Sequence, residues 1–245
     1  MPKAIPKAMP EPTRNSGLVR VIPTRSTPSA NLLRACAPFG LALEQSRALP
    51  CRDLINRAAR ALLYRSKPGT IALITGPSGC GKSSILRALA RLTPCTRAPA
   101  SIPARLAARA VVDVLAGPLE ARLSVLSRAG LADAALLART PLELSEGERH
   151  RLLLALTLTR VRRGRLILID EFTSPLDRAT ARSVALTLSR WARRTKLRLV
   201  IATPHPDLLE SLNPDALLEP ALDASRVRLR WRQGATLGDI TRVDP

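Results

Sequence analysis

Residues 76–83 read Gly-Pro-Ser-Gly-Cys-Gly-Lys-Ser and match the pattern G-x-x-x-x-G-K-[ST] at every fixed position. An apolar run rich in β-formers, residues 70–75, precedes them, and residues 84–90 follow with helical spacing. In a strand, glycine loop and helix of this order, backbone N–H groups and the helix N-terminus bind phosphate oxygens. The stretch therefore predicts a site for nucleotide phosphates.

The residues of this loop are predicted to bind the nucleotide largely through their backbone. Lys82 would reach the β- and γ-phosphates, and the Ser83 hydroxyl would bind Mg²⁺. Cys80 stands at a position where only backbone is needed. The candidate nucleotide-binding residues are Gly76, Pro77, Ser78, Gly79, Cys80, Gly81, Lys82, Ser83 and Ser84.

A second strand, residues 165–171, reads Arg-Leu-Ile-Leu-Ile-Asp-Glu and ends in two acids. A continuous apolar run is typical of a parallel strand covered on both faces, and acids at its carboxyl end emerge where α/β sheets bind ligands. Asp170 would hold Mg²⁺ directly or through water, and Glu171 would polarise the attacking water. The alternative is an ordinary strand end with two solvated acids.

Three further stretches carry a resemblance to a known family. Residues 144–151, Leu-Ser-Glu-Gly-Glu-Arg-His-Arg, resemble the LSGGQ signature of ABC-type ATPases. Residues 170–177, Asp-Glu-Phe-Thr-Ser-Pro-Leu-Asp, resemble that family's Walker B and D-loop run, and His205 takes the place of its switch histidine. The loop at residues 76–83 corresponds to the family's Walker A motif. Together these motifs occur in the family's order and cover residues 76–205. In finer detail the chain resembles soluble ABC-type ATPases, some of which are fused to an acetyltransferase-like domain, although no acetyltransferase-like segment is visible.

This resemblance implies an α/β fold, a P-loop NTPase three-layer sandwich with a mainly parallel sheet and a small helical subdomain. It also implies that two copies bind ATP head-to-tail, with the signature of one facing the phosphate loop of the other. Ser145 and the Gly147 amide would then contact the γ-phosphate in trans, and Asp177 would communicate across the interface. His205 would contact the γ-phosphate and hold the attacking water with Glu171.

The sequence departs from the family pattern in several places. Glu146 and Glu148 stand where Gly and Gln are usual in the signature. No glutamine lies between the phosphate loop and the signature, and Asp113, after the strand-like residues 109–112, is a possible replacement. The residue that stacks on adenine is open between Tyr64 and Phe39, and either could be core. We interpret His150 as a polar helix residue.

Composition places one α/β domain in the 245 residues. Residues 1–30 are predicted to be a disordered, basic, proline-rich arm, and residues 31–245 the ATP-binding domain. The chain has no run of 18 consecutive apolar residues and no cysteine spacing typical of metal sites among its four cysteines. We therefore expect a reduced, cytoplasmic protein.

The net charge of +20 comes from 39 basic and 19 acidic residues. Residues 226–232, Arg-Val-Arg-Leu-Arg-Trp-Arg, alternate, so a strand there would place four arginines on one face. This face could bind nucleic acid phosphates or an acidic protein, or it could be a solvated surface. The chain has two Trp, one Tyr and two Phe, so recognition by base stacking is not expected.

The remaining pattern predicts helices at residues 144–162, 178–195 and 206–212 and strands at 197–203 and 226–232. The leading interpretation is a soluble ABC-type ATPase that dimerises around ATP and hydrolyses it. One alternative is the nucleotide-binding subunit of a transporter, against which the missing glutamine counts. Another is an ATP-gated clamp on a polyanion with slow hydrolysis, which the two signature acids keep open.

Overall fold

The computed structural model describes residues 20–24, 28–39, 41–45, 52–161, 165–221, 226–233 and 236–243. The chain divides into two compact units, Met1–Arg47 and Ala48–Pro245. In the first unit, strands β1 (Arg20–Thr24) and β2 (Leu41–Gln45) pair in parallel. Helix α1 (Ala30–Cys36) and the 3₁₀ turn η1 (Ala37–Phe39) connect them. Most of the arm predicted at residues 1–30 lies outside the described residues, and β1 falls within its span.

The second unit is built on a seven-stranded sheet in the order β4-β5-β6-β3-β7-β8-β9. The first five of these strands run parallel to one another. Strand β8 runs antiparallel to both of its neighbours, β7 and β9. The prediction of a mainly parallel sheet is therefore confirmed. The strands are β3 (Ile71–Thr75), β4 (Cys95–Arg97), β5 (Leu166–Ile169), β6 (Arg198–Thr203), β7 (Ala216–Pro220), β8 (Val227–Gln233) and β9 (Thr236–Val243).

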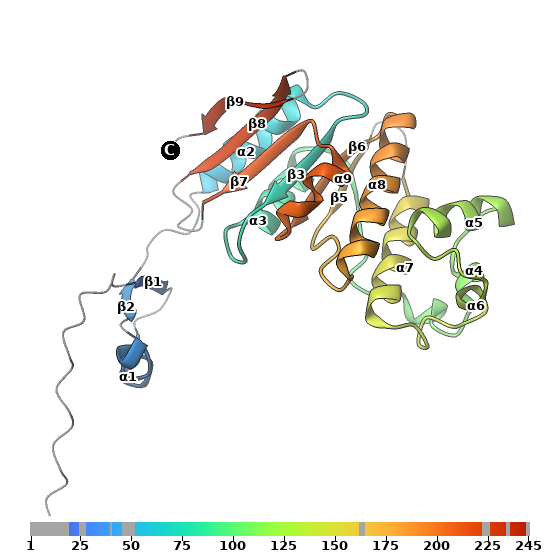
Figure 1. Ribbon diagram of the computed structural model, residues 1–245, viewed down its shortest axis with the longest axis horizontal. Helices are drawn as coiled ribbons and strands as arrows, with labels where there is room; N and C mark the ends of the chain where they lie inside the picture. The colour runs from blue at the N-terminus through green and yellow to red at the C-terminus, as the bar shows by residue number, and fades with distance from the viewer. Residues whose placement is uncertain are drawn as a thin grey trace, which may run out of the picture. The chain divides into compact units, whose positions relative to one another are not determined.

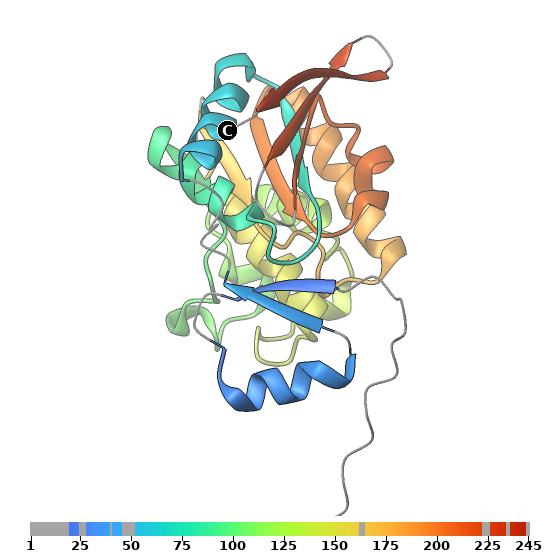
Figure 2. The ribbon, with the colours of Figure 1, turned by 90° about the vertical axis from the view of Figure 1, so that its left-hand side faces the viewer.

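Helices cover both faces of this sheet, which makes three layers (Figures 1 and 2). Helices α2 (Arg52–Arg65) and α3 (Lys82–Leu92) pack on one face. Helices α8 (Arg178–Arg194) and α9 (Leu209–Leu212), with the turn η3 (Pro206–Leu208), pack on the other. The alternation within β3 explains how one strand serves both layers. Its residues Ile71 and Leu73 belong to the α8 core, whereas Ala72 and Ile74 belong to the α2–α3 core.

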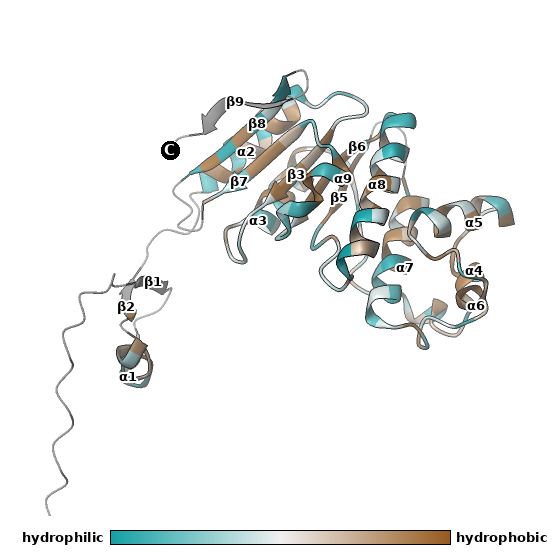
Figure 3. Cartoon of the chain, viewed as in Figure 1, coloured by the Kyte–Doolittle hydropathy of each residue, from teal (hydrophilic) through white to brown (hydrophobic). Residues whose placement is uncertain are grey.

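A small helical part follows β4 and continues the core on the α8 side. It contains the turn η2 (Ala104–Leu106) and helices α4 (Val111–Val114), α5 (Leu119–Arg128), α6 (Ala134–Leu137) and α7 (Glu146–Thr159). Apolar side chains of α7 pack with those of α5 and α8, so the subdomain and the sheet share one cluster. Figure 3 shows the apolar colouring concentrated on the central strands and on the inner sides of these helices.

One strand was predicted in the wrong place. Residues 109–112 were expected to be extended, but Val111–Val114 form a helical turn because the buried side chains, Val111 and Val114, are three residues apart. The strand of this region is β4, next to β5. Strands β7 and β9 were not predicted, whereas the predicted strands at 197–203 and 226–232 correspond to β6 and β8 within one residue at each end.

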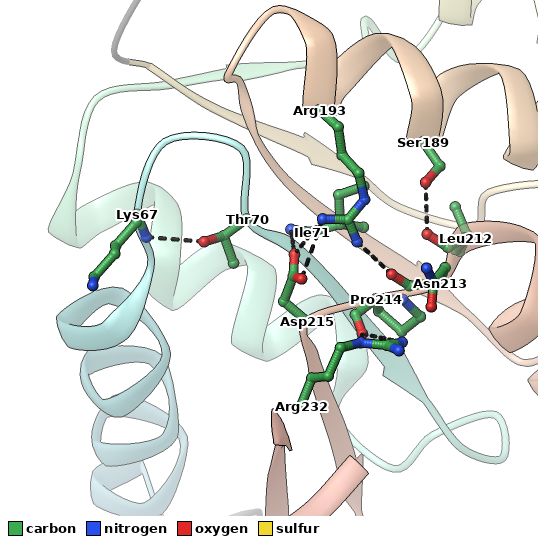
Figure 4. A network of polar contacts seen from close by, with 10 residues as sticks. All are labelled: Lys67, Thr70, Ile71, Ser189, Arg193, Leu212, Asn213, Pro214, Asp215 and Arg232. Atoms are coloured by element: carbon green, nitrogen blue, oxygen red, sulfur yellow. Dashed lines mark hydrogen bonds and ion pairs between the residues drawn. The ribbon is translucent and has the colours of Figure 1, made fainter. Parts of the chain in front are cut away.

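The amino ends of β3 and β7 are joined by a polar network (Figure 4). The Asp215 carboxylate accepts a hydrogen bond of 2.8 Å from the Ile71 N–H and pairs with Arg193 of α8 at 3.2 Å. Arg193 also donates to the Asn213 carbonyl, and Arg232 of β8 donates to the Pro214 carbonyl at 2.9 Å. The network therefore links α8 to three strands at the end of the sheet away from the glycine loop.

Candidate functional site

The glycine loop connects β3 to α3 at the carboxyl edge of the sheet. Gly76 leaves β3 with φ 147°, and a Cβ there would lie 3.0 Å from the Cys80 sulfur and 3.4 Å from the Pro220 carbonyl oxygen. Gly81 caps α3 with φ 101°, in the left-handed region that glycine adopts without strain. Cys80 itself is buried, and its sulfur lies on the inside of the loop next to Gly76.

The Lys82 ammonium folds back over this loop. Its Nζ donates to the carbonyl oxygens of Gly76 and Pro77, each at 2.7 Å. These acceptors are neutral, whereas an anionic phosphate oxygen would add the attraction of opposite charges to the hydrogen bond. A phosphate placed at the mouth of the loop would therefore compete well for Lys82.

Asp170 and Glu171 follow β5 at the same edge of the sheet, with β6 between β5 and β3. Phe172 anchors this segment, because its side chain is fully buried and its N–H donates to the Ala202 carbonyl at 3.0 Å. Glu171 adopts φ 49° and is exposed, while Asp170 is half-buried. The backbone thus holds one carboxylate partly inside the edge and presents the other to solvent.

The residues predicted to hold Mg²⁺ fit that ion chemically. Ser83 and Asp170 offer hydroxyl and carboxylate oxygens, the hard donors that Mg²⁺ prefers. Among the described residues there is no group of three or more His, Cys, Asp or Glu side chains that could cage a metal alone. A Mg²⁺ ion at this edge would therefore be shared between these two side chains, water and the phosphates of the nucleotide.

The signature residues form the start of α7. Ser145 caps the helix, its hydroxyl accepting from the Glu148 N–H at 3.3 Å, and the Glu148 carboxylate accepts from the Ser145 N–H at 2.8 Å. This reciprocal capping box directs Glu148 toward its own helix end. The hydrogen bond from the Ser145 N–H also holds the pKa of Glu148 below its usual value. The acid that replaces the usual glutamine is thus part of the helix cap.

Gly147 lies at a close backbone contact. A Cβ at this position would lie 3.1 Å from the Pro175 carbonyl oxygen and 3.3 Å from Cδ2 of Leu176. The signature helix therefore packs directly against the segment that leads to Asp177. This contact joins two stretches that the sequence placed in separate motifs.

Asp177 and His205 both stand at the beginning of a helical segment. Asp177 caps α8, where hydrogen bonds from Thr180 hold the pKa of its carboxyl below the usual value. His205 precedes η3, is half-buried, and donates its backbone N–H to the Thr203 hydroxyl at 3.2 Å. Because β6 lies between β3 and β5, the loop after it brings His205 to the edge that carries the glycine loop and Glu171.

His150 lies nearer to the two acids after β5 than its sequence position suggests. It lines a cavity of about 270 Å³ together with Asp170 and Glu171. Burial lowers the pKa of its imidazole, and the negative charges of Glu171 and Glu146 oppose that effect. His150 is one helical turn after Glu146 on the signature helix, and this spacing alone gave no signal for the cavity.

Neither the segment beside Asp170 and Glu171 nor Asp113 replaces the glutamine that is missing between the phosphate loop and the signature. The segment Ala98–Pro99–Ala100 after β4 lines the cavity beside Asp170 and Glu171, and it offers no amide side chain. Asp113 is on α4, pairs with Arg122 at 2.9 Å, and does not line that cavity. The expectation that it follows the strand beside the site is therefore wrong, because that strand is β4.

The two aromatic residues considered for adenine stacking, Tyr64 and Phe39, belong to different units of the chain. Tyr64 is 93% exposed near the end of α2, which leads into the amino end of β3. The glycine loop begins at the other end of this five-residue strand, about 16 Å away along the strand. Phe39 belongs to the first unit. Tyr64 thus lies at the wrong end of β3 to meet a nucleotide held by the loop that follows it.

The alternating arginines of β8 have different surroundings. As predicted, Val227, Leu229 and Trp231 are buried. Arg230 pairs with Glu219 of β7 at 2.5 Å, and Arg232 binds the Pro214 carbonyl. Arg226 and Arg228 are exposed. Half of the predicted basic face is therefore occupied by contacts within the sheet.

The strand–loop–helix phosphate site, with acids at a neighbouring strand end, defines a P-loop nucleotide-binding domain. The chain is 29% identical over 188 residues to the probable iron export ATP-binding protein FetA of Escherichia coli (strain K12), covering 64% of this chain and 82% of that protein. It is 34% identical over 155 residues to the aliphatic sulfonates import ATP-binding protein SsuB 2 of Nocardia farcinica, covering 57% of this chain and 64% of that protein. It thus spans less than two thirds of the second relative. No family model matches the chain.

Solved structures show the same fold. The ATP-binding cassette MJ0796, bound to ADP and Pi in a dimeric post-hydrolysis state, is 17% identical with a TM-score of 0.52, covering 64% of this chain and 83% of that one. The archaeal ribosome recycling factor aABCE1 is 22% identical with a TM-score of 0.51, covering 62% of this chain and 32% of that one. The chain is thus similar to these ATP-binding proteins and has the fold of an ATP-binding cassette. The finer resemblance to acetyltransferase-fused ATPases has no support in these comparisons.

Proposed function

We propose that this protein binds Mg-ATP at the carboxyl edge of its sheet and hydrolyses it as a head-to-tail dimer. The observation that carries the proposal is the gathering of Lys82, Glu171 and His205 at one edge, on the loops after three neighbouring strands, β3, β5 and β6. These residues are far apart in sequence, and in open α/β sheets the loops after the carboxyl ends of the strands form the crevice in which ligands bind.

The roles follow from the local geometry. The loop amides and Lys82 bind the phosphates, and Ser83 and Asp170 hold Mg²⁺, which neutralises charge on the phosphoryl oxygens. Glu171, exposed beside the half-buried Asp170, orients and deprotonates the attacking water. His205 contacts the γ-phosphate from the neighbouring loop and fixes the same water. Lys82 leaves its two carbonyl acceptors as it meets the phosphate.

The dimer would complete each site with residues of the second copy. Ser145 is exposed at the N-terminus of a 14-residue helix, a position that favours an anion. Asp177 begins α8 beside it, because Gly147 packs against the segment Pro175–Leu176. The signature and the D-loop therefore form one surface, which would face the phosphate loop of the partner copy.

The decisive experiment combines turnover with assembly. Wild-type protein should hydrolyse Mg-ATP, and Glu171→Gln should keep ATP binding, lose about 10²–10⁴-fold in kcat and elute as a dimer with ATP. Ser145→Arg should bind ATP as a monomer. Mixed with Lys82→Ala, it should regain activity, because one composite site of the mixed dimer is then intact. Wild-type protein without ATP turnover would contradict the proposal.

A second candidate is the nucleotide-binding subunit of a membrane transporter, acting at the cytoplasmic face. The names of the two relatives, an iron export and a sulfonate import ATP-binding protein, favour it. No helix within the described ranges is long and apolar enough to cross a membrane. Co-purification of a membrane protein with the Glu171→Gln variant, dependent on ATP, would support this candidate over a free ATPase.

Binding of a polyanion is the remaining possibility, supported by the net charge of +20 and the exposed Arg226 and Arg228. With Arg230 and Arg232 engaged in the sheet, two phosphate contacts rather than four are expected from this strand. The log–log salt slope contributed by them on duplex DNA would be about −1.8. A slope that does not change in the double variant Arg226→Ser/Arg228→Ser would exclude this strand from such binding.

A further inference from the structure

An ion pair joins the start of α8 to the turn that follows His205. Arg178, the first residue after the Asp177 cap, donates from Nε to Oδ2 of Asp207 at 3.1 Å and from Nη2 to Oδ1. Arg182, one turn later on α8, reaches the same carboxylate at 3.4 Å. Two parallel bonds from a guanidinium to a carboxylate fix the relative orientation of the groups as well as their distance.

The turn η3 is short, and it continues directly into α9. It is a three-residue 3₁₀ turn, Pro206–Leu208, closed by the Leu209 N–H to the Pro206 carbonyl. Such turns have poor hydrogen-bond geometry and are weak by themselves. The side chain of Leu208 is buried and anchors its far end. Asp207 is therefore the polar side chain that ties this turn to α8, two residues after His205.

The Asp207 carboxylate is well suited to anchoring the turn η3 through an ion pair. Its side chain is 33% exposed, and that of Arg178 is 39% exposed, so both are partly withdrawn from water. The hydrogen bonds from Arg178 hold the pKa of Asp207 below the usual range. The pair is therefore charged throughout the neutral range in which an ATPase assay is run.

We propose that Arg178 and Asp207 form a clamp that positions His205 for catalysis, so that the turn carrying His205 follows any movement at the start of α8. The inference rests on the proposed ATPase function, and neither clamp residue is proposed to touch the nucleotide. Asp177 adjoins Arg178 and is expected to face the second copy. The clamp is therefore the path by which contact with that copy would set the position of His205.

The molecule contains a matched control at the other end of α8. Arg193 and Asp215 form a second Arg–Asp pair, at 3.2 Å, with side chains 38% and 27% exposed. The two pairs thus share the helix, the residue types and the degree of exposure. Only the Arg178–Asp207 pair is next to a proposed catalytic residue, so loss of turnover can be separated from general loss of stability.

The test measures kcat, KM and ATP-dependent dimerisation of four variants. Asp207→Asn and Arg178→Gln should lower kcat about 10–100-fold, the range expected when a catalytic group is misplaced by about 1 Å, with the Kd for ATP unchanged within about 2-fold. The double variant Arg178→Gln/Asp207→Asn should be no worse than either single variant, because both remove the same contact. Arg193→Gln should lower the melting temperature while kcat of the folded protein stays at the wild-type value.

A mixed dimer identifies the site on which the clamp acts. One copy carries Lys82→Ala, so only the nucleotide bound by the phosphate loop of the other copy is hydrolysed. Asp207→Asn placed on the copy with the intact loop should reduce this remaining turnover about 10–100-fold. The same substitution on the Lys82→Ala copy should leave it unchanged, because its His205 serves the inactive site.

The results distinguish the failure of this inference from that of the proposed function. Wild-type protein without ATPase activity would contradict the proposed function itself. An active wild type with unchanged kcat in Asp207→Asn would overturn the clamp alone. Equal losses of kcat in Asp207→Asn and Arg193→Gln would also overturn it, because the effect would then come from loosening α8 in general.

Discussion

The two ends of the β3 strand are built in different ways. At the amino end, Asp215, Arg193 and Arg232 satisfy one another and the backbone in the closed network of Figure 4. At the carboxyl end, Lys82 has only backbone carbonyls for its strong hydrogen bonds, and Glu171 is exposed. Polar groups at the first end complete the fold. Lys82 at the second end is placed where an anionic ligand would improve its contacts, and Glu171 is left exposed to solvent.

Backbone and side-chain strain add to this contrast. Thr173, two residues after Glu171, has φ 75°, which a β-branched residue rarely adopts. Its hydroxyl is buried without a hydrogen-bond partner in the structure. Asn213 at the amino end also has a positive φ, but asparagine tolerates it and here ends α9 in the usual way. The carboxyl end thus holds strained local structure of the kind that clusters at functional sites.

The largest expected difference between the two ends is in the effect of removing a lysine, Lys82 or Lys67, on stabilisation by ATP. Lys82→Ala should abolish the stabilisation by ATP, which amounts to about 2.7 kcal/mol at a concentration of 100 Kd, while the protein without ATP melts as the wild type does. Lys67→Ala, an exposed lysine at the amino end, should keep the full ATP-induced shift. Thermal melting with and without Mg-ATP measures both. A full shift in Lys82→Ala would refute the phosphate-loop assignment.

Breaking the network at the amino end should lower the stability of the protein and leave ATP binding unchanged, which is the opposite of the result expected for Lys82→Ala. Asp215→Ala leaves the Ile71 N–H without its acceptor and Arg193 without its carboxylate, so the free energy of unfolding should fall by about 1–3 kcal/mol. Denaturant unfolding gives this value. The Kd for ATP should remain within about 2-fold, because the glycine loop begins at the far end of β3. A tenfold weaker Kd would show that the two ends are coupled.

The carboxyl end could be predicted from sequence because its motifs are local. The glycine loop, the acids after β5 and the capping serine of α7 each depend on neighbouring residues, and the structure places them as expected. The sheet order then follows from the alternation of strands and helices. The functional roles of these residues remain predictions.

The amino end and the contacts between motifs could not be predicted in this way. Asp215 binds a backbone group 144 residues away, and Asp207 binds an arginine 29 residues away. No local pattern marks such pairs. The strand expected at residues 109–112 failed for a related reason: two valines favour extended backbone, but packing within the helical part decided for a helix. His150 became relevant only once β5 and α7 were seen to line one cavity.

A smaller effect is expected where two motifs touch at the carboxyl end. In Gly147→Ala, the added methyl group crowds the Pro175 carbonyl at 3.1 Å, while alanine favours the helix by up to about 1 kcal/mol. These terms oppose each other, so the free energy of unfolding should change by less than about 1 kcal/mol. Turnover should nevertheless fall about 10-fold, because the segment before Asp177 must move. Unchanged kcat would mean that this segment can shift without effect on catalysis.

The smallest effect is expected at the cap of α7. The pKa of Glu148 is lowered in the folded protein, so its charge adds stability that is fully present above the unfolded pKa and is lost as pH falls through the folded pKa. Glu148→Gln keeps an acceptor for the Ser145 N–H but removes the charge, and at pH 7 it should cost about 0.3–1 kcal/mol. The difference between the variant and the wild type should shrink as pH falls from the ordinary glutamate pKa of about 4.3 through the lowered folded pKa, because the wild-type carboxyl then becomes protonated as well. Unfolding curves at pH 7 and pH 3.5 test this. A constant difference would place the effect in packing instead, and a gain in ATP affinity would show that the charge of Glu148 also reaches the nucleotide.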